Sequence, residues 1–221
     1  MGVKTEEKDK QALFNFADSL TRFGYVVVWP RTEALATEEK MIEDPSTFVE
    51  AFTYLQRRDE VDRKRISFIG FSVGSSLAMV AAESPTINEK VHGFVFFGGY
   101  YSIFDYLQSL VTETMLVNEE ILFWKPAEGA VSHAEKVLEK EGGLKLKQFQ
   151  KISQKDTFGG LLRYSPDQNI DKLKARVFIL HHREDPYVPF VESIKLREAL
   201  NKKRQVDFHL SNLFAHAQVK Q

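Results

Sequence analysis

The chain has 221 residues, of which 43% are hydrophobic and 12% aromatic, and it contains no cysteine. This size suits one packed domain, and the lack of thiols excludes disulfides, cysteine–zinc sites and a cysteine nucleophile. With 30 Lys and Arg residues against 31 Asp and Glu residues, the formal net charge is -1, so nothing favours nucleic acid as a partner.

No uninterrupted apolar run approaches the roughly 20 residues that cross a bilayer, so we expect no membrane span. The first residues are charged and lack the apolar core of a signal peptide. Together with the lack of cysteine, this favours a reducing, cytoplasmic location.

The start of the chain predicts one helix and one strand. Apolar residues recur every three or four positions over 5–23, which predicts a helix that Thr5 begins and Gly24 ends. The run YVVVWP, residues 25–30, is hydrophobic until the proline that closes it. It predicts a strand buried on both faces, as in a parallel sheet.

Short β-branched and aromatic runs then alternate with helical patterns. The expected strands are 65–70, 91–99, 175–182 and 205–212, the last of them at a sheet edge. The expected helices are 46–58, with a cap at Ser46, 73–83 and 190–203. This order predicts an α/β fold, in which a single domain over 1–221 holds a mostly parallel sheet flanked by helices.

Residues 101–172 interrupt the alternation. They separate two expected strands, contain no convincing strand pattern, and are aromatic at the start and charged and helical further on. A connection of this length is uncommon in a compact domain. We therefore expect a helical insert over the sheet, a lid rather than a second domain.

One pentapeptide stands where a strand is expected to turn into a helix: Gly70-Phe71-Ser72-Val73-Gly74. It fits G-x-S-x-G, in which a sharp turn lifts a serine hydroxyl clear of its strand. The flanking glycines remove side chains that would collide with neighbouring backbone, and the N–H of Val73 can stabilise an oxyanion at the helix N-terminus. The competing interpretation is a glycine-flanked turn with a capping serine.

A nucleophilic serine needs a base to take its proton and an acid to orient that base. In this chain order the acid comes before a final histidine. Asp185 follows the strand 175–182, at the carboxyl edge where sites form in open α/β sheets. Glu184 is the rival acid, and Asp185 is preferred because an Asp-Pro turn fixes its geometry. The alternative role of Asp185 is a turn or cap residue ahead of the helix 190–203.

Two histidines near the C-terminus are candidates for the base. His209 lies inside the last expected strand, where its side chain packs against the sheet. His216 lies beyond the end of that strand and can reach over Ser72. We therefore select His216, for which the alternative is an ordinary surface histidine.

The pair His181-His182, close to Asp185, raises the question of a metal ion. Successive strand residues point to opposite faces of a sheet. Both imidazoles therefore cannot easily bind one ion, and we expect no metal.

Together these residues resemble the α/β-hydrolase family, in its dienelactone-hydrolase-like and carboxylesterase branches. One match is GFSVG after a strand, and another is HHREDPYVP, which is similar to an H-G-x-x-D-x-x-V-P signature with His182 in place of glycine. The third is NLFAHA, which is similar to the family's histidine loop. The resemblance covers nearly the whole chain.

The resemblance implies that Ser72 is the nucleophile, His216 the base and Asp185 the orienting acid, without any cofactor. Val73 and Gly2 would provide the oxyanion donors. The insert would act as a lid. The residues expected to line the substrate pocket are Phe71, Tyr100, Phe104 and Trp124.

The chain also departs from the family. If 25–30 corresponds to the family's strand four, the strand three that belongs in the middle of the sheet is absent. Two buried strand edges would then be unpaired, at a cost of roughly several kcal/mol. We therefore expect an N-terminally incomplete fold: a fragment, a gene product whose start was placed late, or a sheet that another segment or subunit completes.

The leading hypothesis for function is a serine hydrolase that cleaves carboxylic esters of small to medium size. A non-catalytic binding protein of the same fold is one alternative. A peptidase or thioesterase is another, because the triad chemistry is shared. The expected partner is a small-molecule ester, and self-association into a homo-oligomer is left open.

Overall fold

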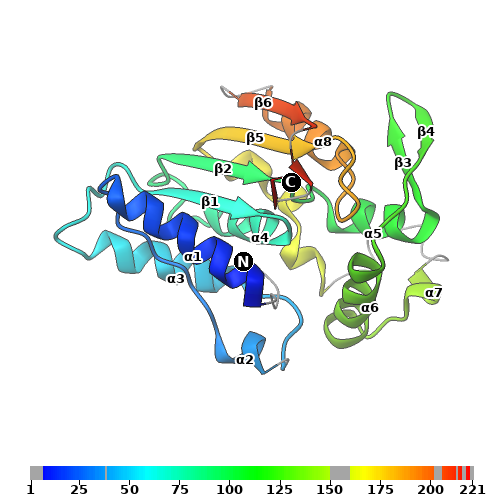
Figure 1. The fold of residues 1–221 in the computed structure, drawn as a ribbon, viewed down its shortest axis with the longest axis horizontal. Helices are drawn as coiled ribbons and strands as arrows, with labels where there is room; N and C mark the ends of the chain where they lie inside the picture. Colours follow the sequence, from blue (N-terminus) through cyan, green and yellow to red (C-terminus); the bar gives the residue numbers. More distant parts are fainter. Residues whose placement is uncertain are drawn as a thin grey trace.

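A four-stranded parallel sheet lies at the centre of the molecule, in the order β1-β2-β5-β6 (Figure 1). The structure is a computed structural model and describes residues 7–37, 39–149, 160–201, 206–212, 214–215 and 218–219. The strands of the sheet are β1 (Ser67–Phe71), β2 (Gly93–Phe97), β5 (Arg176–His182) and β6 (Val206–Ser211). All four point the same way, so their carboxyl ends meet at one edge.

Helices connect and flank these strands. They are α1 (Glu7–Arg22), α2 (Glu33–Ala36), α3 (Pro45–Gln56), α4 (Val73–Ala82), α5 (Ile103–Thr112), α6 (Glu128–Gly142), α7 (Leu146–Phe149) and α8 (Val191–Asn201). The helix α4, which is rich in small residues, packs against α3, β1 and β2. The α/β class and the mostly parallel sheet are confirmed, with β6 at the expected sheet edge. Within the described ranges, no helix combines the length and apolarity needed to cross a membrane.

The expected helix 5–23 is confirmed as α1. It ends at Gly24, whose φ is +86°, while the N–H of Tyr25 donates to the backbone oxygen of Leu20 at 3.2 Å. Positive φ is the common way for a helix to end, and glycine adopts it without a steric penalty.

The expected strand 25–30 is wrong. The segment has no regular secondary structure, and 64% of Tyr25 and 46% of Val26 are exposed. A β-branched run becomes a strand only when a neighbouring strand pairs with it. In the described part of the chain, β1 is at the end of the sheet and pairs only with β2.

The helix expected over 46–58 is α3, but a different residue caps it. The carboxylate of Asp44 accepts a hydrogen bond from the N–H of Ser46 at 2.9 Å, so Asp44 is the cap. Pro45 then occupies the first helical position, where its missing N–H costs nothing.

The insert contains strands that were not expected. An antiparallel hairpin joins β3 (Thr114–Val117) to β4 (Glu120–Phe123). Its two-residue turn, Asn118-Glu119, has φ values of 50° and 69°, which match the twist of paired strands. Three apolar side chains of the hairpin are more than half exposed: Leu116, Ile121 and Phe123. The usual alternation of buried apolar and exposed polar residues is therefore missing, and the sequence gives no strand signal here.

The insert shares the hydrophobic core of the sheet. Leu107 of α5 and Leu138 of α6 are buried in the same cluster as Phe94 and Phe96 of β2. Figure 1 shows α1 and α3 at one end of the molecule and the hairpin, α6 and α7 at the other. The carboxyl ends of the strands point toward the insert.

Candidate functional site

Ser72 occupies a strained turn between β1 and α4. Its φ of 53° and ψ of -141° lie outside the regions that non-glycine residues normally adopt, and such strain costs about 1–3 kcal/mol. The N–H of Ser72 donates to the backbone oxygen of Phe97 at 2.8 Å. The N–H of Ser75 donates to the backbone oxygen of Ser72, also at 2.8 Å. The hydroxyl of Ser72 makes no capping hydrogen bond to α4, so the interpretation of Ser72 as a capping serine is wrong.

The turn is possible because glycine precedes it at Gly70. A Cβ atom at this position would lie 2.5 Å from the Cα of Ser75, closer than real Cβ contacts. Gly99, after β2, is equally crowded, since a Cβ there would lie 2.8 Å from the Cβ of Ser75. The two glycines let the start of α4 lie directly against the ends of β1 and β2.

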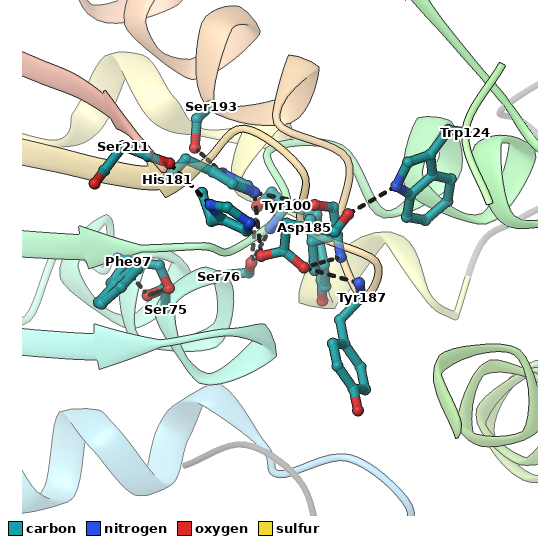
Figure 2. A network of polar contacts seen from close by, with 12 residues as sticks. Ser75, Ser76, Phe97, Tyr100, Trp124, His181, Asp185, Tyr187, Ser193 and Ser211 are labelled. Carbon is teal, nitrogen blue, oxygen red and sulfur yellow. Dashed lines mark hydrogen bonds and ion pairs between the residues drawn. The ribbon is translucent and has the colours of Figure 1, made fainter. Parts of the chain in front are cut away.

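Two buried serines join α4 to the end of β2 (Figure 2). The hydroxyl of Ser75 accepts from the N–H of Phe97 at 3.0 Å and donates to its carbonyl at 3.2 Å. The hydroxyl of Ser76 accepts from the N–H of Tyr100 at 2.9 Å and donates to its carbonyl at 2.7 Å. Sequence reasoning missed this role. Adjacent serines in an apolar helix were the available signal, because buried hydroxyls need partners.

Of the two expected oxyanion donors, the structure describes only Val73. Val73 is the first residue of α4, and the first four N–H groups of a helix have no acceptor within the helix. The helix dipole adds to their attraction for negative charge. Gly2, the other expected donor, lies outside the described residues, as does Thr5.

Asp185 is built into the loop that follows β5, residues 183–190, here called the acid loop. Its carboxylate is buried, and Oδ1 accepts from the N–H of Tyr187 at 2.8 Å and from that of Val188 at 3.1 Å. The rival acid, Glu184, is exposed. Of the two carboxylates, that of Asp185 is therefore held in a fixed orientation by its own loop.

His181 lies beside this carboxylate in the interior. Its Nε2 is 3.0 Å from the backbone oxygen of Val188, and its Nδ1 is 2.6 Å from the hydroxyl of Ser193 (Figure 2). Because a carbonyl only accepts, Nε2 carries a hydrogen, and in the neutral ring Nδ1 accepts from the serine. His182 turns elsewhere, since its Nδ1 donates to the backbone oxygen of Ser211 in β6 at 2.9 Å.

Ser72 and Asp185 share the carboxyl edge of the sheet. The parallel register places Phe71 beside Phe97 and Phe97 beside Leu180. Two strand spacings of about 4.8 Å separate β1 from β5, so a triad at this edge would need a third residue between the serine and the acid. The expected base, His216, lies outside the described residues. The alternative base, His209, lies within β6, and its side chain is exposed.

Solved structures share the fold of this chain. An acetyl xylan esterase from Paenibacillus sp. R4 aligns with a TM-score of 0.54 and 15% identity, over 78% of this chain and 49% of that one. The acylaminoacyl peptidase of Pyrococcus horikoshii aligns with a TM-score of 0.51 and 15% identity, over 77% of this chain and 23% of that one. The chain has the α/β-hydrolase fold.

A 2,6-dihydroxy-pseudo-oxynicotine hydrolase is a third structure with this fold, at a TM-score of 0.52 and 14% identity, over 79% of this chain and 41% of that one. The chain thus spans less than half the length of each of these three proteins. No protein-family model matches the sequence, and no curated protein shows significant sequence similarity to it.

Two of the residues expected to line a pocket of this α/β-hydrolase fold are buried, and their role in a pocket stays a prediction. The ring of Tyr100 stacks on that of Tyr106 with 5.3 Å between centroids, and its hydroxyl donates to the backbone oxygen of Tyr164 at 3.0 Å. Trp124 is buried, and its indole N–H donates to the backbone oxygen of Asp185 at 2.7 Å. These contacts tie the insert to the edge of the sheet.

The other two expected pocket residues are partly exposed. Phe71 lies 5.7 Å from the ring of Phe16 on α1 and 5.8 Å from that of Phe97 on β2. Phe104 packs edge-on against Phe149, with 5.4 Å between centroids. Their partial exposure leaves surface for a ligand, and their role in a pocket stays a prediction.

Proposed function

We propose that the chain is a serine hydrolase that cleaves carboxylic esters through Ser72, His216 and Asp185. The observation that carries this proposal is the backbone of Ser72, whose φ is 53° at a strand-to-helix turn. Strain of this kind is retained at functional sites and is rarely kept elsewhere. The buried, ordered carboxylate of Asp185 at the same edge of the sheet supports it.

The proposed reaction has two halves. In the first, the hydroxyl oxygen of Ser72 attacks the ester carbonyl carbon while His216 takes the hydroxyl proton. The tetrahedral intermediate collapses, the bond to the alcohol oxygen breaks, and His216 gives its proton to that oxygen. In the second, water attacks the acyl-serine, His216 takes a proton from the water and returns it to Ser72, and the carboxylic acid leaves.

The remaining residues stabilise charge. The N–H of Val73, with a second donor proposed at Gly2, would bind the oxyanion of both tetrahedral intermediates. Asp185 would orient the ring of His216 and stabilise its positive charge after proton transfer. Phe71 and Phe104 are proposed to contact the acyl or alcohol group.

The nature of the leaving group is the open choice within this proposal. One solved structure with the fold is named an esterase and another a peptidase. Ester cleavage is preferred here to peptide cleavage because an alcohol is a better leaving group than an amine. A panel of p-nitrophenyl esters of increasing acyl length, with p-nitroanilides and a thioester beside it, would rank the three substrate classes.

Covalent labelling tests the proposal directly. A fluorophosphonate probe should label the folded protein, and peptide mapping should place the label on Ser72. Ser72→Ala should abolish both labelling and ester turnover. The matched variant Ser67→Ala, at an exposed serine of the preceding strand β1, should retain both. Turnover near background that Ser72→Ala leaves unchanged would instead favour a non-catalytic binding protein.

A further inference from the structure

Two donors from the insert hold successive carbonyls of the acid loop. The indole Nε1 of Trp124 lies 2.7 Å from the backbone oxygen of Asp185. The backbone N–H of Ala127 donates to the backbone oxygen of Pro186 at 2.7 Å. Figure 2 shows the indole of Trp124 pointing at the acid loop from the insert side. These contacts join residues about 60 positions apart, directly after β4 and directly after β5.

The donor side of this connection is itself fixed. Trp124 is 7% exposed, and its backbone N–H donates to the backbone oxygen of Glu113 at 2.7 Å. This bond closes the base of the β3–β4 hairpin. Ala127 is the residue before α6 and has the extended backbone of a helix N-cap. The hairpin and α6 therefore present both donors from ordered backbone.

The acceptor side carries the candidate acid. The carboxylate of Asp185 binds the N–H groups of Tyr187 and Val188, so the carboxylate and the backbone of its loop move as one unit. A shift of the peptide between Asp185 and Pro186 therefore moves the carboxylate. Whatever fixes these two carbonyls also fixes the direction in which the acid points.

We propose that Trp124 is a positioning residue for the orienting acid. Its indole N–H, with the N–H of Ala127 as a second tie, sets the orientation of Asp185 and through it that of the histidine base. The insert then helps to build the triad as well as covering the sheet. This inference rests on the proposed serine hydrolase function.

The positioning role differs measurably from the pocket role expected for Trp124. A residue that lines the pocket binds the substrate, so its loss raises KM. A residue that orients the acid acts on the chemical step, so its loss lowers kcat and leaves KM in place. A displacement of about 1 Å in a catalytic group can cost roughly 100-fold in rate.

Two variants remove the ties singly. Trp124→Phe keeps an aromatic ring and removes the indole N–H. Ala127→Pro removes the second donor, and the φ of -67° at Ala127 fits a proline ring. With a p-nitrophenyl ester, we expect each to lower kcat roughly 10- to 100-fold, with KM changed less than about twofold. Val137→Ala, which shortens a buried α6 side chain and leaves both ties in place, should lose less than about twofold in kcat.

A double-mutant cycle separates positioning from general loosening of the fold. Asp185→Asn removes the acid, and the rate of fluorophosphonate labelling remains measurable when turnover is slow. If Trp124 acts through Asp185, Trp124→Phe should slow labelling in the native background and add less than about twofold in the Asp185→Asn background. Urea unfolding of each variant checks that it is folded under the assay conditions.

The inference is overturned if Trp124→Phe raises KM at constant kcat, if its effect persists undiminished beside Asp185→Asn, or if Val137→Ala loses as much. In these cases the native protein still turns over the ester and Ser72→Ala does not. If instead the native protein shows no Ser72-dependent turnover, the proposed function itself fails, and the positioning role fails with it.

Discussion

The Nε2 of His181 lies 3.5 Å from Oδ2 of Asp185, and both side chains are fully buried. The same nitrogen donates to the backbone oxygen of Val188, and the other ring nitrogen contacts the hydroxyl of Ser193. One imidazole thus connects the end of β5, the acid loop and α8. A buried polar group that loses its hydrogen-bond partner destabilises the folded state. Several buried groups would lose a partner if this ring were removed.

Replacing this ring should destabilise the protein. His181→Phe keeps a planar ring but leaves both the Val188 carbonyl and the Ser193 hydroxyl without the imidazole. We expect a loss of about 2–4 kcal/mol in the free energy of unfolding, measured by urea denaturation. Ser193→Ala removes only one of these contacts and should cost about 1 kcal/mol. A His181→Phe protein as stable as the Ser193→Ala protein would show that the imidazole is not the central contact.

Gly70 is predicted to tolerate no side chain. In Gly70→Ala the new Cβ would lie 2.5 Å from the Cα of Ser75, so α4 has to move away from β1. We expect a loss of about 1–3 kcal/mol in unfolding free energy, together with loss of labelling at Ser72. Gly129→Ala is the matched control, because its Cβ meets nothing within 4 Å. In α6 it should stabilise by up to about 1 kcal/mol. Equal stability of the two variants would contradict this reading of the turn.

The sequence predicted those parts of the fold whose signals are local. The strands β2 and β5 and the helix α4 follow from apolar runs and helical spacing of a few residues. The segment 25–30 has an equally apolar sequence and forms no strand. A hydrophobic run indicates that a segment tends to be buried. Whether the segment forms a strand depends on which other segment lies beside it.

The candidate site divides in the same way. The pentapeptide 70–74 is a local signal that predicted a strained turn, and the structure shows this strain at Ser72 and the crowding at Gly70. Asp185 was preferred for its Asp-Pro turn, and it is the buried acid of the two. The contact between Trp124 and Asp185 joins residues 61 positions apart, and no local pattern indicates it. The selection of His216 stays a prediction.

A second buried carboxylate anchors the start of the insert to α8. Glu192 is fully buried, and its Oε2 accepts from the N–H of Ser102 at 2.9 Å and from that of Tyr101 at 3.1 Å. Its Oε1 lies 2.8 Å from the Nζ of Lys195, which also lies 2.9 Å from a carboxylate oxygen of Asp105 on α5. The lysine therefore neutralises a charge that the interior would otherwise disfavour.

Removing this lysine should produce a pH-dependent loss of stability. Burial raises the pKa of Glu192 above its usual 4.5, and Lys195 opposes that rise. Without the cation the pKa rises further. A carboxyl with a raised folded pKa favours folding fully below its unfolded pKa, and this contribution is lost as the pH rises through the folded pKa. Lys195→Met should therefore cost about 2–4 kcal/mol at pH 8 and clearly less at pH 5.

Urea unfolding of Lys195→Met and the native protein at both pH values measures this difference. The double variant Glu192→Gln/Lys195→Met carries no titrating group at either position. The extra loss at pH 8 should therefore disappear in the double variant. A penalty for Lys195→Met that is the same at pH 5 and pH 8 would show that the charge of Glu192 is not its source.

The strain at Ser72 predicts an inverted order of stability for two variants that lack the hydroxyl. Ser72→Ala keeps the Cβ atom and with it the strain at φ 53°, whereas Ser72→Gly relieves about 1–3 kcal/mol of strain and costs about 0.5–1 kcal/mol in chain entropy. We expect the glycine variant to be the more stable by about 1 kcal/mol in urea. At Ser67, in the extended backbone of β1, the same pair should show the opposite order. A Ser72→Gly protein less stable than Ser72→Ala would refute the strain. Since neither variant at position 72 has a hydroxyl, their difference isolates the backbone cost of holding the serine in this turn.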